Sequence, residues 1–588
     1  MRYDIVLVTY NSINWLNGCV KAIANTKYDL AQLNLIFVDN ASCDDTVNML
    51  HQLKLEHSGF GGFEIIQNRA NKGFGAACNL GADSGNSPFI FFLNTDTEVY
   101  PDLFCKLDAA AAAHADAAAY ECRQLPYEMG HHFDPVTLET SWASGAALLV
   151  RRSAFVAVKG FDEHLFMYCE DVDLSWRLRA LCGKIYYVPD AIVTHFVLAR
   201  ETPKVQELRE YAYTLLGTLL LAWKYGRFKD ILCAELDYLK VIQHPKHYDG
   251  VRRVLCKNYL RHFISLFAFF FWRFANKKAF KAAPWQPNGS FAPERGRAVL
   301  EKHLDNGPLI SVVVRTCARL STLRLTLQTL RHQSYRNFEV IVIEDGKATA
   351  EECLKTEFSD LNIHYHATGK NIGRGKAGNL GLSLAKGDYC NFLDDDDFFY
   401  PDHLELMADT AIRHPNADLI LGTAMVMKIE TLCKEPYSYT VREVYSMHFD
   451  RVDNLTMCQT CQIPIQSAMF KKTMFLKYGG LREDINANED WTMWLKYLAH
   501  GMRINKQHVD IDRATSIFVL PASEALLKER LLKYKADDNA FYSDNSLRFD
   551  VSLADMREYY KGVMADFEHL YHEGKLEEYF AETKSKYE

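Results

Sequence analysis

The stretch that decides the fold is an acidic turn, "NFLDDDDFFYPD" at residues 391–402, in which four aspartates follow an apolar run. Three hundred residues earlier stands "FFLNTDTEVYPD", residues 91–102, with the same apolar lead and the same Tyr-Pro-Asp exit. A lone acidic turn is often a solvated loop or a helix N-cap. Adjacent carboxylates repel one another, however, and a bound divalent cation relieves that repulsion. The repeated context therefore predicts a cation site that the chain builds twice.

Other motifs repeat in the same order. "NKGFGAACNLG" at 71–81 matches "NIGRGKAGNLG" at 371–381, again 300 residues apart. Further on, residues 144–183 match residues 465–501, with an apolar-basic-Phe pattern, a glycine turn and a Glu-Asp pair in each. A period this long excludes a solenoid and indicates a duplicated domain.

Length and periodicity set the architecture. A chain of 588 residues is too long for one hydrophobic core. Each copy alternates β-branched runs with helical patterns, which predicts an α/β fold with a Rossmann-like, mostly parallel sheet. We expect a first domain at 1–200, a helical linker at 201–305, a second domain at 306–525 and a helical tail at 526–588.

Charge and cysteine usage narrow the function classes. The net charge of −8 argues against a nucleic-acid partner. Fifteen cysteines follow no disulfide-like framework, and a strand-like run begins at the first residues, which favours the cytoplasm. Cys458 and Cys461 have metal-like spacing, but no second pair completes a zinc site, so we expect ordinary buried thiols.

The predicted linker contains one strongly apolar run, "HFISLFAFFFWRF" at 262–274, which is too short to span a bilayer. Two interpretations stay open: a buried linker helix, or a helix at the inner membrane face. Basic residues surround the run: Arg252, Arg253, Lys257, Arg261, Arg273, Lys277, Lys278 and Lys281.

Polar residues gather at the predicted carboxyl ends of the strands, where ligands bind in sheets of this kind. They are Thr9, Tyr10, Asp39, Asn94 and Asp96 in the first copy, and Thr316, Glu344, Asp345 and Asp394–Asp397 in the second. The repeated Glu-Asp pairs open helices, and a carboxylate held there beside a cation is a candidate general base.

A glycine-rich stretch needs separate treatment. "GRGKAG" at 373–378 fits the dinucleotide pattern GxGxxG. Its twin "GFGAAC" lacks the third glycine, and no clear strand precedes either stretch. We therefore expect no nicotinamide or flavin site.

Taken together, these motifs resemble family 2 glycosyltransferases, which have the GT-A fold. The resemblance covers about 1–196, through "VDNAS", "LNTDTEVYP" and "VPDAIVTH", and about 308–520, through "IEDG", "FLDDDDFFYPDHL" and "NEDWTMWL". The first half is similar to the rhamnosyltransferase branch. The resemblance implies inverting transfer of a hexosyl or deoxyhexosyl group from a nucleoside diphosphate to an acceptor hydroxyl.

The resemblance also implies roles for residues. A Mn²⁺ or Mg²⁺ ion would be held by Asp96 and His195, with Asn94 in place of the first acid, and in the second copy by Asp394, Asp396 and Asp397. The donor would contact Thr9, Tyr10, Asp39, Asn71, Gly73 and Asn94, and then Thr316, Glu344, Asp345, Asn371, Gly373 and Asp395. The general bases would be Asp171 and Asp490, with Glu170 and Glu489 beside them; Asp173 would support its helix or the acceptor.

Two departures from the family pattern suggest that the copies use different donors. Glu344 stands where the first copy has Asp39, and Thr515 falls near a position that often carries a histidine. The expected function is a bifunctional enzyme that builds a cell-surface glycan, of capsule or O-antigen type, on a glycan or lipid-linked glycan acceptor. Two alternatives stay open: one copy only binds glycan, or the chain is a non-catalytic carbohydrate- or Ca²⁺-binding scaffold.

Overall fold

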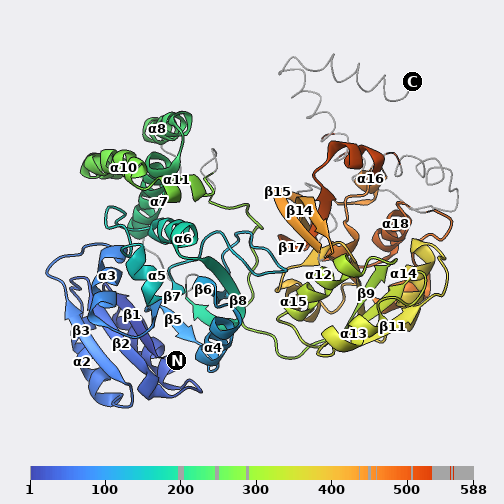
Figure 1. Cartoon of the computed structure of the whole chain (residues 1–588), viewed down its shortest axis with the longest axis horizontal. Coiled ribbons are helices and arrows are strands. Elements are labelled where there is room, and N and C mark those ends of the chain that lie inside the picture. Colours follow the sequence, from blue (N-terminus) through green and yellow to red (C-terminus); the bar gives the residue numbers. More distant parts are fainter. Residues whose placement is uncertain are drawn as a thin grey trace. The chain divides into compact units, whose positions relative to one another are not determined.

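The computed structural model describes residues 2–196, 204–244, 250–285 and 291–532, apart from short gaps at 436, 448–451, 459, 486, 505–507 and 531, together with residues 557 and 561. Most of the predicted tail at 526–588 lies outside the described residues. The chain divides into two compact units, Met1–His303 and Leu304–Glu588 (Figure 1). The helical segment predicted as a linker belongs to the first unit.

The first unit is built on an eight-stranded mixed sheet of order β3-β2-β1-β4-β7-β6-β8-β5. Strands β1 to β4 run parallel, and β7 and β5 are antiparallel to their neighbours. The strands are β1 (Tyr3–Thr9), β2 (Leu33–Asp39), β3 (Gly62–Gln67), β4 (Phe89–Leu93), β5 (Thr97–Val99), β6 (Ala117–Leu125), β7 (Ala147–Arg151) and β8 (Lys184–His195).

The second unit repeats this order as β11-β10-β9-β12-β16-β14-β17-β13, with β15 (Tyr437–Met447) added on β14. The identical order is what a duplicated domain predicts, and both sheets are α/β, as expected for two tandem GT-A domains. The strands are β9 (Ile310–Thr316), β10 (Phe338–Glu344), β11 (Ile363–Ala367), β12 (Tyr389–Asp394), β13 (Phe398–Phe399), β14 (Leu419–Lys434), β16 (Ala468–Lys471) and β17 (Ile511–Pro521).

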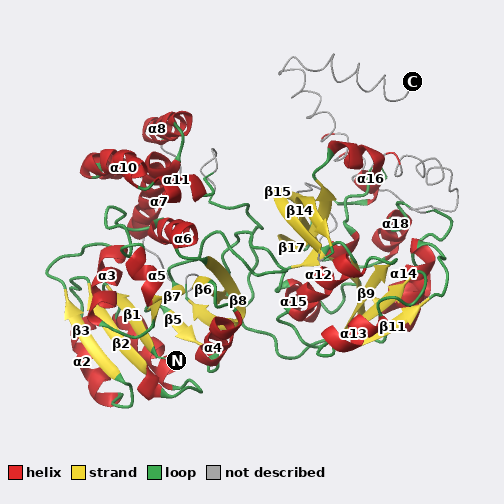
Figure 2. Ribbon diagram, in the orientation of Figure 1, coloured by secondary structure: helices red, strands yellow, loops and turns green. Residues whose placement is uncertain are grey.

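Helices cover the sheets (Figure 2). In the first unit they are α1 (Ile13–Ala24), α2 (Thr46–Glu56), α3 (Phe74–Ser84), α4 (Leu103–Ala113), α5 (Arg152–Ala157) and α6 (Glu170–Leu181). In the second they are α12 (Leu320–Arg331), α13 (Glu351–Glu357), α14 (Arg374–Leu384), α15 (His403–Arg413), α16 (Asn454–Met457), α17 (Lys472–Tyr478) and α18 (Trp491–His500).

Register places the functional strand ends together. Thr9 pairs with Asp39 across β1 and β2, and Thr316 pairs with Glu344 across β9 and β10. Because these strands are parallel, their carboxyl ends share one edge of each sheet. The expectation that no strand precedes the glycine-rich stretches was wrong, since β3 and β11 do. Both strands lie at a sheet edge and are partly exposed, so their sequences contain polar residues and show no continuous apolar run.

In the sequence, five helices follow the first sheet: α7 (Lys204–Tyr225), α8 (Phe228–Gln243), α9 (Val251–Arg261), α10 (Phe263–Ala275) and α11 (Lys277–Ala282). Helix α7 packs against α8, α9 and α10, and α11 packs against α6. Their shared core includes Trp176 of α6 and Leu216 of α7. None of the helices among the described residues is both long and apolar enough to cross a membrane.

Candidate active sites

In the first domain, the end of β2 holds a buried carboxylate. Asp39 accepts hydrogen bonds from Thr9 Oγ1 at 2.9 Å, from Ser42 N at 3.0 Å and from Ser42 Oγ at 2.5 Å. Ser42 is a partner that the sequence did not single out. Tyr10, which follows the strand, is 47% exposed. Asp39 therefore fixes the loop after β2, and Tyr10 projects from the same edge.

Asn40, directly after β2, holds the glycine-rich loop at 71–73 against this edge of the sheet. Asn40 Nδ2 donates to Gly73 O at 2.9 Å, and Gly73 N donates to Asn71 Oδ1 at 2.9 Å. Gly73 has φ +94°, and a Cβ there would lie 2.4 Å from Phe166 O, so only glycine fits this close approach. The loop then leads into α3.

The acidic turn after β4 places Asp96 beside a histidine. His195 Nε2 lies 3.5 Å from Asp96 Oδ2, and both side chains are buried. His195 Nδ1 contacts Gln124 Oε1 at 2.8 Å, and Nε2 has no hydrogen-bond partner among the described residues. Gln124 therefore orients the ring so that Nε2 faces Asp96. Asn94 starts the turn, and its backbone N–H donates to Ala146 O at 2.9 Å.

The Glu-Asp pair lies at the start of α6. Asp171 accepts from Gly145 N at 3.0 Å and from Val172 N at 2.8 Å. Burial raises the Asp171 pKa above its ordinary value, although these two amides oppose the rise. Burial and the charge of Asp171 raise the Glu170 pKa well above its ordinary range, and Glu170 Oε2 has no hydrogen-bond partner within the described parts of the chain. Asp171 is thus the partly buried, oriented carboxylate of the pair.

Asp173 has a structural role. It forms ion pairs with Arg177 at 2.7 Å and Lys224 Nζ at 2.6 Å, and it accepts from Tyr225 OH at 2.7 Å. These contacts tie α6 to α7. The expectation that Asp173 supports its helix fits this geometry.

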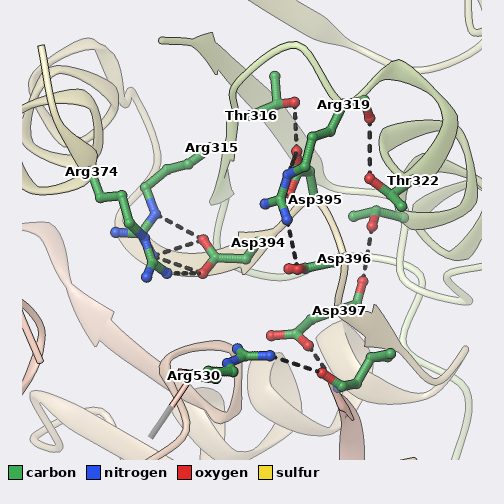
Figure 3. A network of polar contacts seen from close by, with 12 residues as sticks. Arg315, Thr316, Arg319, Thr322, Arg374, Asp394, Asp395, Asp396, Asp397 and Arg530 are labelled. Atoms are coloured by element: carbon green, nitrogen blue, oxygen red, sulfur yellow. Dashed lines mark hydrogen bonds and ion pairs between the residues drawn. The ribbon is translucent and has the colours of Figure 1, made fainter. Parts of the chain in front are cut away.

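In the second domain, arginines surround the acidic turn (Figure 3). Asp394 ends β12, and its two oxygens accept from Arg315 Nε at 2.8 Å, Arg315 Nη2 at 2.9 Å and Arg374 Nη2 at 2.9 Å. Burial alone would raise the Asp394 pKa, but the two guanidinium groups outweigh it and lower the pKa to about 2. Asp394 is therefore an ionised carboxylate that two arginines already hold.

The next two aspartates share a third arginine. Asp395 accepts from Thr316 Oγ1 at 2.6 Å and pairs with Arg319, whose Nη1 lies 2.8 Å from Asp396 Oδ2. Asp395 is buried, whereas Asp396 is partly exposed. Arg319 is half-exposed and bridges the buried Asp395 and the partly exposed Asp396.

Asp397 faces the last long strand. Its Oδ1 accepts from Val519 N at 2.9 Å, and burial raises its pKa well above the ordinary value. This side chain therefore joins the turn to β17. The sequence predicted that Asp394, Asp396 and Asp397 hold a metal together. In the structure, Asp394 and Asp396 form ion pairs with arginines, and Asp397 accepts a hydrogen bond from a backbone amide.

Thr515 is not the counterpart of the histidine, so that expectation needs correction. The tyrosine of each Tyr-Pro-Asp exit donates its backbone N–H to Ile192 O at 3.1 Å in the first domain and to Thr515 O at 3.0 Å in the second. Thr515 therefore corresponds to Ile192, and Phe518 occupies the register position of His195. Thr515 Oγ1 contacts His403 Nδ1 at 2.8 Å inside the domain. The error arose because the sequence gives no register.

The second Glu-Asp pair also differs from the first. Glu489 Oε1 lies 2.8 Å from Arg315 Nη1 and 3.4 Å from Arg374 Nε. Asp490 precedes α18, and burial together with the charge of Glu489 raises the Asp490 pKa to about 7. Arg315 thus joins the acidic turn to the segment that carries the candidate base.

A pocket of about 340 Å³ opens at this edge of the second sheet. Its lining combines the three arginines with four predicted donor-binding residues, Thr316, Asp345, Asn371 and Gly373, and with Cys317, Ala377 and Asp394. Asp345 accepts from Ile372 N at 2.7 Å and Gly373 N at 3.0 Å, so it holds the glycine-rich loop as Asn40 does in the first domain.

Glu344 has turned away from this pocket. It accepts from Thr349 N at 2.9 Å, Ala350 N at 3.0 Å and Tyr365 OH at 2.5 Å. Although burial opposes the change, these hydrogen bonds lower the Glu344 pKa. Glu344 fixes the loop before α13, and Asp345 is the acid that lines the pocket.

The functional residues that the sequence analysis missed are mostly these arginines. An alignment of the two copies by motif, with Thr316 on Thr9 and Gly373 on Gly73, would have found them, since Arg315, Arg319 and Arg374 replace Val8, Ser12 and Phe74. Three arginines that occur only in the copy with extra aspartates indicate that these arginines pair with the acidic turn. Gln124 had no such signal, because only the pairing of β6 with β8 brings it to His195.

The two sites differ in how well they fit a metal. No cluster of three or more His, Cys, Asp or Glu side chains suited to a metal occurs among the described residues. In the first domain the unpartnered Nε2 of His195 beside Asp96 fits a cation that completes its shell with diphosphate oxygens. In the second domain arginines form ion pairs with the carboxylates of Asp394, Asp395 and Asp396, so this turn does not fit a metal ion.

Known proteins similar to the chain are glycosyltransferases. An uncharacterised glycosyltransferase of Rickettsia typhi is 25% identical over 263 residues, which are 41% of this chain and 80% of that protein. An uncharacterised glycosyltransferase of Haemophilus influenzae is 28% identical over 32% of this chain and 62% of its own length. A Mycobacterium tuberculosis N-acetylglucosaminyl-diphospho-decaprenol L-rhamnosyltransferase is 53% identical over 62 residues, 10% of this chain and 20% of that enzyme.

Solved structures with a similar chain path include S. aureus TarS 1-349 in complex with UDP-GlcNAc, at 13% identity and a TM-score of 0.31, over 48% of this chain and 89% of that one. Another is the mannosyltransferase PcManGT from Pyrobaculum calidifontis in complex with GDP-Man and Mn²⁺, at 15% identity and a TM-score of 0.32, over 46% and 87%. At these values the likeness says nothing about substrates.

The sequence profile described as glycosyl transferase family 2 matches residues 4–173 and 311–477. The two matches fall on the two sheet domains and together cover more than half of the chain. The chain therefore belongs to glycosyl transferase family 2, with a family domain in each half.

Proposed function

We propose that the chain is a bifunctional inverting glycosyltransferase that takes sugars from nucleoside-diphosphate donors and adds them to a growing cell-surface glycan. One observation carries the proposal: each domain brings a loop-fixing acid after its second strand, an acidic turn and an oriented Glu-Asp pair to one edge of its sheet. Binding of a donor and activation of an acceptor hydroxyl need these parts together.

In the first domain, Asp171 would take the proton of the acceptor hydroxyl as that oxygen bonds to the anomeric carbon, while the sugar–phosphate bond breaks and the nucleoside diphosphate leaves. Its two amide donors orient the carboxylate, and its raised pKa makes it a better proton acceptor than an ordinary aspartate. Asp96 and His195 would hold Mn²⁺ or Mg²⁺. That ion, when bound, supplies positive charge to the leaving diphosphate.

In the second domain, Asp490 would be the base, and Arg319 and Arg374 would contact the donor diphosphate from the pocket wall. Guanidinium groups bind phosphate oxygens with two parallel hydrogen bonds, so they can neutralise the leaving group without a metal. Arg315 would act as a positioning residue, because it holds Asp394 and Glu489 from within the domain.

The test uses single-turnover and steady-state transfer with a panel of nucleotide sugars. Asp171→Asn and Asp490→Asn should each abolish one transfer and leave the other unchanged. Loss of both transfers in one variant would show a single active centre, and one silent variant would show that its domain only binds glycan. No transfer or donor hydrolysis by the wild-type chain would refute the proposal in favour of a scaffold.

A further inference from the structure

Helix α10 exposes an unusual apolar face. Its inner side, with Leu266 and Phe269, is buried against the core shared with α7. Its outer side carries apolar side chains that recur every three or four residues and are largely exposed. They are Leu260 at the end of α9, then Phe263, Ile264, Phe267, Phe271 and Phe274, with exposures from 45% to 82%.

Positive charge surrounds this face. Residues 251–282 contain eight basic and no acidic side chains, in a chain whose net charge is −8. Seven of the eight are exposed. Five of these seven flank α10 in the sequence and form no ion pair with a described residue: Arg253, Lys257, Lys277, Lys278 and Lys281. The other three serve the fold. Arg252 caps the end of α8, Arg261 lies over the Phe166 ring, and Arg273 packs on Phe270.

We infer that this face, Leu260–Phe274 with its flanking lysines and arginines, docks the protein on the surface of an anionic lipid bilayer. An exposed apolar face of this size marks an interaction site. At 13 residues, α10 is too short to span the bilayer, but it can lie in the headgroup region with its aromatic side chains inserted. Anionic headgroups then meet the basic residues at both ends of the helix.

The neighbouring helix α8 provides the contrast that favours lipid over a general apolar partner. It also exposes apolar side chains, among them Phe228 and Leu232, at 79% and 52%. Its sequence, however, carries three acidic residues against two basic ones. Apolar exposure alone therefore does not distinguish the two helices, and the charge does.

The test is co-sedimentation of the full chain with vesicles, which needs no sugar donor and so fails independently of the proposed function. The wild type should bind vesicles of phosphatidylcholine mixed with phosphatidylglycerol and not vesicles of phosphatidylcholine alone. Ile264→Glu/Phe271→Glu should abolish binding. Lys277→Gln/Lys278→Gln/Lys281→Gln should weaken it by about fivefold for each charge removed and reduce its salt dependence.

The matched control is Phe228→Glu/Leu232→Glu, which adds the same charges to α8 and should leave binding unchanged. Circular dichroism and the midpoint of thermal unfolding check that each variant folds. The inference is overturned if the wild type binds neither vesicle, or if the α8 control loses binding equally. It is also overturned if Ile264→Glu/Phe271→Glu leaves vesicle binding unchanged but converts a dimer of the wild type to a monomer in sedimentation velocity, because the face would then join two copies of the chain.

Discussion

The two sheets have the same strand order, but they differ near the end of the first strand, where the first domain has Val8 and the second domain has Arg315. Around that position the charges differ. The first acidic turn keeps one aspartate, Asp96, beside the unpartnered nitrogen of His195. The second turn has four aspartates, and Arg315, Arg319 and Arg374 pair with three of them.

This difference shows two ways to keep carboxylates at one sheet edge. Burying an unpaired charge costs several kcal/mol, so each carboxylate must find a cation or become neutral. In the first domain Glu170 forms no ion pair with a described residue, and its raised pKa favours the neutral form. In the second, the corresponding Glu489 is ion-paired with Arg315. Three of the four adjacent aspartates are therefore tolerated because arginines of the same domain pair with them, and burial raises the pKa of Asp397, which favours its neutral form.

The largest expected effect tests whether the two turns differ in function. Asp96→Ala should reduce the first transfer by about 10²–10³-fold, because it removes a side chain proposed to hold the metal. Asp396→Ala should reduce the second transfer by less than about tenfold, because Asp395 and Arg319 remain paired. Rates for each donor, measured with purified variants, decide between these outcomes. Equal losses in both domains would mean that both turns bind a metal.

Chelation sharpens the same contrast without changing the sequence. Treatment with EDTA should lower the first transfer by about 100-fold, and Mn²⁺ or Mg²⁺ should restore it. The second transfer should fall much less, because arginines occupy the turn. Both activities are measured in one sample with two donors, so that each serves as control for the other. A second transfer that vanishes with EDTA would contradict the arginine assignment.

The sequence alone predicted those features of the two domains that depend on residues close together in the chain. The repeated acidic turns, glycine-rich loops and Glu-Asp pairs predicted two α/β domains and the sheet edges that carry the sites. Contacts set by strand register were out of reach, such as Gln124 with His195 or Phe518 at the histidine position. The helical segment read as a linker packs on the first domain because α6 and α7 share a core, which periodicity alone does not reveal.

Stability measurements should show how much Arg315 contributes to the second domain. Arg315→Met should destabilise the second unit by about 3–5 kcal/mol, because it leaves Asp394 and Glu489 buried with one fewer cation. The matched control is Arg324→Met, which removes an exposed ion pair with Glu357 and should cost about 1 kcal/mol or less. Urea unfolding followed by tryptophan fluorescence measures both. Equal effects would show that Arg315 does not hold the two carboxylates.

The smallest expected effect concerns pH. Asp490 must be ionised to accept a proton, and its pKa is raised to about 7, so the second transfer should fall as the pH drops below about 7. Removing the charge of Glu489 lowers the Asp490 pKa, so Glu489→Gln should move this acid limb to lower pH. The profile of kcat/KM against pH for the second donor measures the shift. Loss of Glu489 also leaves Arg315 and Arg374 with one fewer carboxylate, and their charges lower the Asp490 pKa in the same direction. An unmoved limb would assign the titration to another group and remove Asp490 as the base.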